Sequence, residues 1–110
     1  LFIEPDISTV ELSKSCGADA IEIHTGTYCN AKKDQEATKE LNRIIEASKY
    51  AMDLNLIVNA GHGLNTKNIL PLLQIPNLEE VNIGHSIISR SIFIGLDNAV
   101  KEMLEILQST

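Results

Sequence analysis

The sequence predicts an α/β fold in which four strand–helix units form half of a (β/α)8 barrel. Four short apolar runs rich in Ile or Val alternate with segments that have the spacing of amphipathic helices. Such alternation is typical of a parallel sheet with right-handed crossovers. The composition, 44% hydrophobic and 22% charged, is that of an ordinary globular protein. A complete barrel has about 250 residues, so the 110 residues of this chain correspond to half of one domain.

Two further features favour a half-barrel. Four units alone would leave two open sheet edges, which are prone to aggregation. The chain also begins at Leu1 inside an apolar run, whereas a domain commonly begins with a looser end. We therefore expect residues 1–110 to be the half of one barrel, the last four units, with further sequence upstream. A small doubly wound sheet is the alternative fold.

The expected strands are apolar runs of four or five residues, which are too short to be helices. They lie at residues 1–4, 20–24, 56–60 and 80–84. Because side chains alternate across a strand, Ile21 and Ile23 share one face, and Glu22 and His24 share the other. The apolar faces are expected to pack against outer helices.

The clearest helical pattern covers residues 34–54. Its apolar stripe consists of Ala37, Leu41, Ile44, Ser48 and Ala51. An earlier helix is expected to be capped by Asp6 and to end near Cys16, with Ile7 and Val10 pointing inward.

Two helical regions follow in the second half of the chain. Asn65 or Thr66 is expected to cap a helix, although Pro71 leaves its start open. Residues 86–94 and 96–107 are expected to form a short and a longer helix on either side of Gly95. The stripe of the longer helix consists of Leu96, Val100, Met103 and Leu107.

Charge and composition exclude several classes of partner. Nine Lys and Arg residues against fifteen Asp and Glu residues give a net charge of −6, so the chain lacks the basic face of a nucleic-acid-binding protein. No apolar run approaches the roughly 20 residues that a membrane span needs. The two cysteines, Cys16 and Cys29, are too few for a disulfide framework and fit a reducing cytoplasm.

Polar side chains on the inward faces of the strands predict a site at the carboxyl end of the sheet. Glu22, Asn59 and Asn82 are expected to point into the barrel near its carboxyl-terminal mouth, where active sites of this fold lie. The alternative is that the two amides are structural struts in the barrel core. A functional role is favoured for Glu22, because burying a carboxylate without a role is costly.

All three histidines, His24, His62 and His85, lie at the end of an expected strand or in the loop after it. A histidine there can donate or accept a proton near neutral pH. His24 is at least as well explained by packing as by catalysis. The three rings and Glu22 could alternatively hold a divalent metal, although no tight ligand spacing is present.

Glycine-rich turns next to two of these histidines predict a phosphate site. Gly61 and Gly63 flank His62, and Gly84 and His85 precede the short helix. Glycine lets backbone approach a ligand closely, and a helix N-terminus offers free N–H donors to an anion. The alternative for the second turn is a tight turn capped by a serine.

Three stretches together resemble one family, pyridoxine 5′-phosphate synthase, in its C-terminal half. The stretches are Ile21-Glu22-Ile23-His24-Thr25-Gly26, Val58-Asn59-Ala60-Gly61-His62-Gly63-Leu64 and Val81-Asn82-Ile83-Gly84-His85-Ser86. The resemblance implies a (β/α)8 barrel enzyme that joins 1-deoxy-D-xylulose 5-phosphate to 3-amino-2-oxopropyl phosphate. The products are pyridoxine 5′-phosphate, phosphate and water, and no metal or organic cofactor is required.

The resemblance also implies roles for particular residues. His62 matches the family's proton donor, and Glu22 matches a carboxylate that stabilises the transition state. Gly63, Gly84 and His85 match positions that bind 3-amino-2-oxopropyl phosphate.

At the level of the whole protein, the resemblance implies a cytoplasmic homo-octamer that binds phosphorylated small molecules. The family's N-terminal half carries further catalytic groups, so the chain alone is expected to be inactive. Two alternatives remain: another phosphate-binding barrel enzyme, such as a metal-dependent isomerase or aldolase, and a half-barrel that binds phosphorylated ligands without catalysis.

Overall fold

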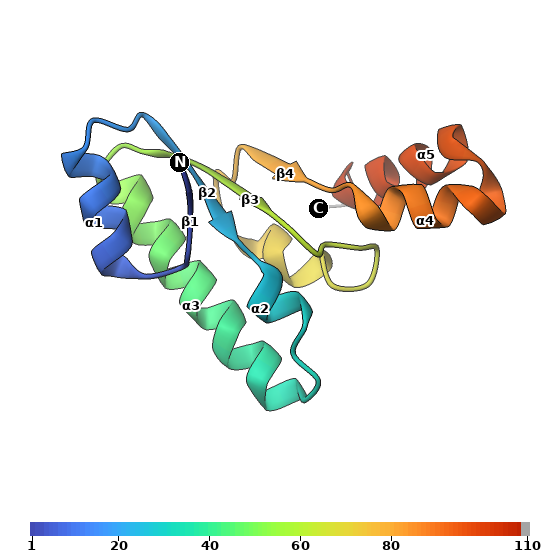
Figure 1. The fold of residues 1–110 in the computed structure, drawn as a ribbon, viewed down its shortest axis with the longest axis horizontal. Helices are drawn as coiled ribbons and strands as arrows, with labels where there is room; N and C mark the ends of the chain where they lie inside the picture. The colour runs from blue at the N-terminus through green and yellow to red at the C-terminus, as the bar shows by residue number, and fades with distance from the viewer. Residues whose placement is uncertain (109–110) are drawn as a thin grey trace.

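The computed structural model describes residues 1–108 and contains one four-stranded parallel sheet in that part of the chain. The strands are β1 (Phe2–Ile3), β2 (Ala20–His24), β3 (Ile57–Gly61) and β4 (Glu80–Asn82), and they follow one another in the sheet in chain order. The helices are α1 (Ile7–Ser15), α2 (Gly26–Cys29), α3 (Asp34–Asp53), the 3-10 helix η1 (Leu70–Gln74), α4 (His85–Ile94) and α5 (Leu96–Gln108). Figure 1 shows α4 and α5 extending away from the other elements.

The predicted α/β class is confirmed, and the four expected strands are present: β2 has the expected bounds, and the bounds of the other three differ by at most two residues. The strand order β1-β2-β3-β4 contains no reversal, whereas a doubly wound sheet has a switch point at which the order reverses. The strand order therefore disfavours the doubly wound alternative for residues 1–108.

The two faces of the sheet differ in burial. Ile21, Ile23 and Val58 lie on one face and are at most 1% exposed, because they belong to one apolar core with residues of α1, α3 and η1. On the opposite face, Phe2 and Ile57 remain 56% and 50% exposed. That second face also carries Glu22 and Asn59, which are register partners on β2 and β3.

The long helix α3 confirms its predicted stripe. Ile44, Ser48 and Ala51 are buried, while Ala37 and Leu41 are half-buried and contact the core. Lys39, Glu46 and Lys49 between them are exposed, which is the arrangement that the 3.6-residue period predicts, whereas Glu40 and Arg43 are partly buried.

The prediction for the first helix was partly wrong. Val10 is buried as expected, but Ile7 is 45% exposed. Asp6 occupies the N-cap position without a side-chain capping bond. Its carboxylate instead accepts a hydrogen bond of 2.6 Å from the guanidinium of Arg43 on α3, a longer-range partner that the sequence does not reveal.

The segment after residue 64 forms less helix than expected. The side chain of Asn65 accepts hydrogen bonds from the backbone N–H groups of Lys67 and Asn68, which closes a turn rather than capping an α-helix. Only the short 3-10 helix η1 follows, with Pro71 in its first turn.

The two C-terminal helices are confirmed, but the predicted stripe of α5 is only half buried. Met103 is buried and Leu107 is half-buried, whereas Leu96 and Val100 are exposed. Gly95 separates the helices with φ of +84°. Within residues 1–108, no helix has the length and apolar character needed to cross a membrane.

Candidate active site

A pocket of about 470 Å³ lies between the loop after β3 and the beginning of α4. It is lined by His62, Gly63, Leu64, Asn82, Gly84, His85, Ser86 and Ile88. Four of the five predicted site residues are therefore in one pocket. The fifth, Glu22, reaches its edge through a contact with Asn82.

Asn82 on β4 donates a hydrogen bond from its side-chain amide to Oε1 of Glu22 on β2. Gly61 on the intervening strand makes this contact possible: a Cβ atom at Gly61 would lie 2.6 Å from Oε2 of Glu22. The carboxylate therefore rests over a glycine, where any side chain would displace it. The backbone of Gly61 has no positive φ that would require glycine. Glycine is needed at this position because it leaves room for the carboxylate of Glu22.

The alternative of a structural strut finds no support for Asn59 within residues 1–108. Its side-chain oxygen is buried and has no hydrogen-bond partner in that part of the chain. A buried amide oxygen without a donor is unusual in native proteins. Asn82 thus has a defined partner, and Asn59 does not.

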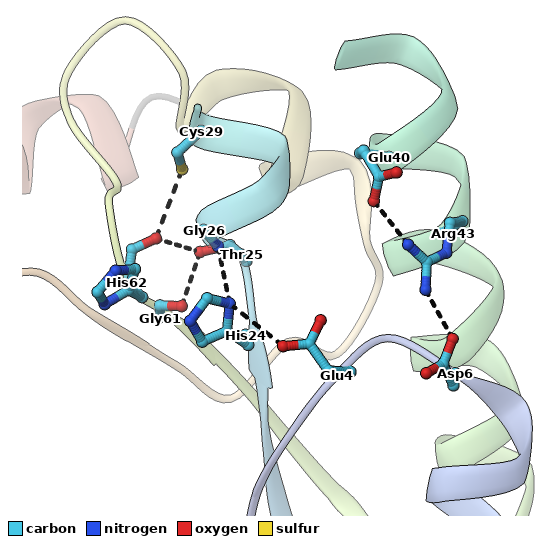
Figure 2. A network of polar contacts seen from close by, with 10 residues as sticks. All are labelled: Glu4, Asp6, His24, Thr25, Gly26, Cys29, Glu40, Arg43, Gly61 and His62. Carbon is cyan, nitrogen blue, oxygen red and sulfur yellow. Dashed lines mark hydrogen bonds and ion pairs between the residues drawn. The ribbon is translucent and has the colours of Figure 1, made fainter. Parts of the chain in front are cut away.

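The backbone of His62 is held in an uncommon conformation. Its φ is +88°, a left-handed value that few residues other than glycine adopt. The buried hydroxyl of Thr25 lies 2.7 Å from the carbonyl oxygens of both Gly61 and His62, and the thiol of Cys29 lies 3.5 Å from the latter (Figure 2). The residues that follow β2 therefore fix the loop that carries His62.

Cys29 favours its protonated form in this setting. Burial raises the pKa of its thiol above the ordinary value, and the hydrogen bond with Thr25 opposes this effect without cancelling it. A protonated thiol can donate to the carbonyl of His62, which is the contact that the structure shows.

The rings of His24 and His62 stack, with centroids 4.7 Å apart and planes inclined by 24°. Nδ1 of His24 accepts a hydrogen bond of 3.1 Å from the backbone N–H of Gly26 (Figure 2). Nδ1 also lies 3.8 Å from Oε1 of Glu4. His24 is thus packed and hydrogen-bonded, which is one of the two roles that the sequence left open for it, and the ring that it contacts is the predicted proton donor.

The N-terminus of α4 opens into the pocket. Gly84 is the N-cap, no side chain caps the helix, and no atom lies within 4 Å of the place where a Cβ would stand. The predicted alternative of a cap by Ser86 is wrong: its hydroxyl donates a 2.7 Å hydrogen bond to the carbonyl of Leu64. This bond ties the beginning of α4 to the loop after β3, and the helix N–H groups stay available to an anion.

The histidines and Glu22 are not gathered as metal ligands. In the described part of the chain, residues 1–108, no group of three His, Cys, Asp or Glu side chains could hold a metal ion. The structure therefore gives no ligand set to the metal alternative.

Sequence reasoning missed the residues that support the site rather than those that line it. Thr25 and Cys29 hold the His62 loop, and Gly26 and Gly61 leave room for the rings and the carboxylate. Their position in the sequence could have identified two of them, because Thr25 and Gly26 follow directly after the expected strand at residues 20–24.

Comparison with known proteins identifies the family of this chain. The model of the family described as "Pyridoxal phosphate biosynthesis protein PdxJ" matches residues 1–109. The pyridoxine 5′-phosphate synthase of Chlorobium phaeobacteroides is 51% identical over 108 residues, which are 98% of this chain and 46% of that protein. The enzymes of the same name from Coxiella burnetii and Trichlorobacter lovleyi are 53% identical over 103 residues and 50% identical over 108 residues, covering 43% and 45% of their lengths.

The chain thus spans somewhat less than half the length of these curated relatives. Its similarity nevertheless covers 94% or more of the chain in each case. The family match and these identities together show that the chain belongs to the PdxJ family of pyridoxal phosphate biosynthesis proteins.

Proposed function

We propose that this chain is the C-terminal half of the barrel of a pyridoxine 5′-phosphate synthase. The complete enzyme would join 1-deoxy-D-xylulose 5-phosphate to 3-amino-2-oxopropyl phosphate and release pyridoxine 5′-phosphate, phosphate and water. The observation that carries the proposal is the single pocket in which His62, Gly63, Gly84 and His85 meet.

The phosphate of 3-amino-2-oxopropyl phosphate would bind at the N-terminus of α4. The uncapped N–H groups there and the open space at Gly84 support this placement. Gly63 and His85 line the same pocket and would contact the substrate. A phosphate gains from the partial positive charge of a helix N-terminus, as well as from its N–H donors.

His62 would donate protons to the reacting oxygens. The ring is exposed at the pocket, and its supporting loop is fixed by Thr25, so it combines access with a defined position. Condensation and loss of water and phosphate each require proton transfer at oxygen, for which an imidazole is suited. Glu22, held by Asn82, would stabilise the cationic imine intermediates of the condensation.

The other half of a (β/α)8 barrel would cover the open face of the sheet. Phe2 and Ile57 on that face are at least half exposed, which supports burial by another part of the same protein. The covering half would supply the remaining catalytic groups, so that the 110-residue chain alone is inactive.

The complete protein would assemble as a homo-octamer in the cytoplasm. Exposed apolar side chains on α4, Ile88, Ile92 and Phe93, support burial in a larger assembly. The two free cysteines support a reducing compartment.

The proposal is tested with the complete protein, in which this chain is joined to its other half-barrel. Both substrates are supplied, and pyridoxine 5′-phosphate and inorganic phosphate are measured. We expect the two products to form in equal amounts. His62→Ala should abolish both while the protein remains folded. If His62→Ala instead lowers the stability of the protein but leaves the turnover of the folded enzyme unchanged, His62 has a structural role.

A further inference from the structure

Three aromatic rings from three neighbouring parts of the sheet form a column at its carboxyl end. Phe2 comes from β1, His24 from the end of β2 and His62 from the loop after β3. The centroid of His24 lies 4.9 Å from that of Phe2 and 4.7 Å from that of His62. These separations are typical of attractive ring contacts, and His24 occupies the middle of the column.

The hydrogen bond from Gly26 fixes the orientation of the His24 ring. Because the backbone N–H of Gly26 donates to Nδ1, a neutral His24 carries its proton on Nε2. Glu4 lies 3.8 Å from the same nitrogen, and its side chain is 56% exposed. The closer Gly26 contact, at 3.1 Å, therefore sets the orientation.

Gly26 also provides the space in which the two imidazoles meet. A Cβ there would lie 2.3 Å from Cε1 of His24 and 2.9 Å from Cδ2 of His62. The backbone of Gly26 is helical and its φ is not positive, so its conformation does not require glycine. What requires glycine here is the pair of rings.

Apart from the stacking contact with His24, no hydrogen bond within residues 1–108 holds the ring of His62. Across residues 1–108, the hydrogen bonds to His62 reach its carbonyl oxygen, from Thr25 and Cys29, and none reaches its ring nitrogens. The backbone is thereby fixed, but the direction of the imidazole depends on the face of His24. Both ring nitrogens of His62 stay available for a substrate.

We propose that His24 is a positioning residue: its flat ring, oriented by the N–H of Gly26, holds the imidazole of His62 in the direction needed for proton donation. This inference rests on the proposed function for the role of His62 and adds the residue that orients it. His24 acts through His62 and needs no contact with the substrate.

Two substitutions of similar size test whether position 24 needs a flat ring or only a side chain that fills the space. In the complete enzyme, His24→Phe keeps a ring that can stack, and His24→Leu fills the space without one. We expect His24→Leu to lower kcat by about 100-fold, the cost of a misplaced catalytic group, with KM unchanged. His24→Phe should lose less kcat than His24→Leu, because it keeps the stacking face but not the acceptor for the N–H of Gly26. Gly26→Ala should resemble His24→Leu, because its methyl group displaces the rings.

Glu4→Gln provides the matched control, since it removes the charge near Nδ1 but leaves the Gly26 hydrogen bond. We expect its kcat to equal that of the wild-type enzyme. An equal loss in Glu4→Gln and His24→Leu would overturn the proposal in favour of an ion pair. Equal losses in His24→Phe and His24→Leu, or no loss in His24→Leu, would also overturn it.

NMR of the ring protons of His62 tests the column without any need for turnover. The ring-current shift that His24 imposes should disappear in His24→Leu and return in His24→Phe, and the ¹⁵N shifts of His24 should report a proton on Nε2. If the enzyme forms no product but these signals behave as expected, the proposed function fails and the column stands. If the His62 signals do not respond to His24→Leu, the inference fails whatever the turnover.

Discussion

Asn82 holds Glu22 from two strands away, across the glycine of the strand between them. The amide of Asn82 donates to Oε1 of the carboxylate, while Oε2 lies over Gly61. An acidic group, an amide and a glycine from three consecutive strands therefore form one unit at the carboxyl end of the sheet.

Removing the amide should misplace the carboxylate. A hydrogen bond to a charged group contributes about 1.5–3 kcal/mol, so Asn82→Ala should lower kcat of the complete enzyme roughly 10- to 100-fold. Asn82→Asp should lower it further, because it places a second carboxylate against Glu22. Steady-state kinetics measures both. Asn42 is an exposed amide on α3, and Asn42→Ala is the control, which should leave kcat unchanged. Wild-type kinetics in Asn82→Ala would show that the contact has no part in catalysis.

A methyl group at Gly61 should destabilise the protein. A Cβ atom there would lie 2.6 Å from Glu22 and 3.1 Å from Asn82, and overpacking of this kind costs about 1–3 kcal/mol. Urea unfolding of Gly61→Ala should show this loss. Gly84→Ala is the comparison, because no atom lies within 4 Å of its added methyl group. Equal stabilities of the two variants would contradict the packing described for Glu22.

The hydroxyl of Thr25 should be needed for the loop of His62. Thr25→Val keeps the shape but removes the hydroxyl donor to the carbonyls of Gly61 and His62. These carbonyls keep the backbone N–H of residue 25 and the thiol of Cys29 as partners, so the cost is that of an ordinary hydrogen bond, about 0.5–1.5 kcal/mol. Unfolding free energy should fall by that amount, and kcat should fall with it. Thr27→Val, two residues away and exposed, should stay within about 0.5 kcal/mol of wild type. The prediction fails if both threonines tolerate valine equally.

Stability should decline at alkaline pH through Cys29. Burial raises the pKa of this thiol above its ordinary value of 9.0. The folded state therefore keeps the proton longer than the unfolded state does, so the contribution is complete below that value and is lost as the pH rises through the folded pKa. Cys29→Ala should flatten the alkaline decline in unfolding free energy. Burial also raises the pKa of Tyr28 above its ordinary value of 10.0. Tyr28→Phe therefore separates the loss of stability due to Tyr28, at higher pH, from the loss due to Cys29. An unchanged decline in Cys29→Ala would contradict this assignment.

The sequence predicted the parts of the fold that depend on local pattern. The run of Ile21 and Ile23 and the stripe of α3 bury as their periods require, because side-chain direction follows directly from strand and helix geometry. Ile7 and Val100 were expected to be buried and are exposed. Their burial depends on what lies opposite each helix, which no local period reports.

The candidate site shows the same division. Strand ends placed Glu22, His62 and His85 near one edge, since the carboxyl ends of parallel strands meet there. The clamp of Thr25 on the His62 loop joins residues 37 apart in the chain, and the contact of Asn82 with Glu22 joins residues 60 apart. Such pairs follow from sheet register and side-chain rotamers, so the sequence alone could name the groups but not their partners.

The most direct test of the account exchanges this chain into a known synthase. In the Chlorobium phaeobacteroides enzyme, to which it is 51% identical over 108 residues, the matching segment is replaced by this chain and pyridoxine 5′-phosphate formation is measured. We expect an active chimera that becomes inactive with His62→Ala. A folded chimera that forms no product, or one that keeps its full rate with His62→Ala, would contradict it.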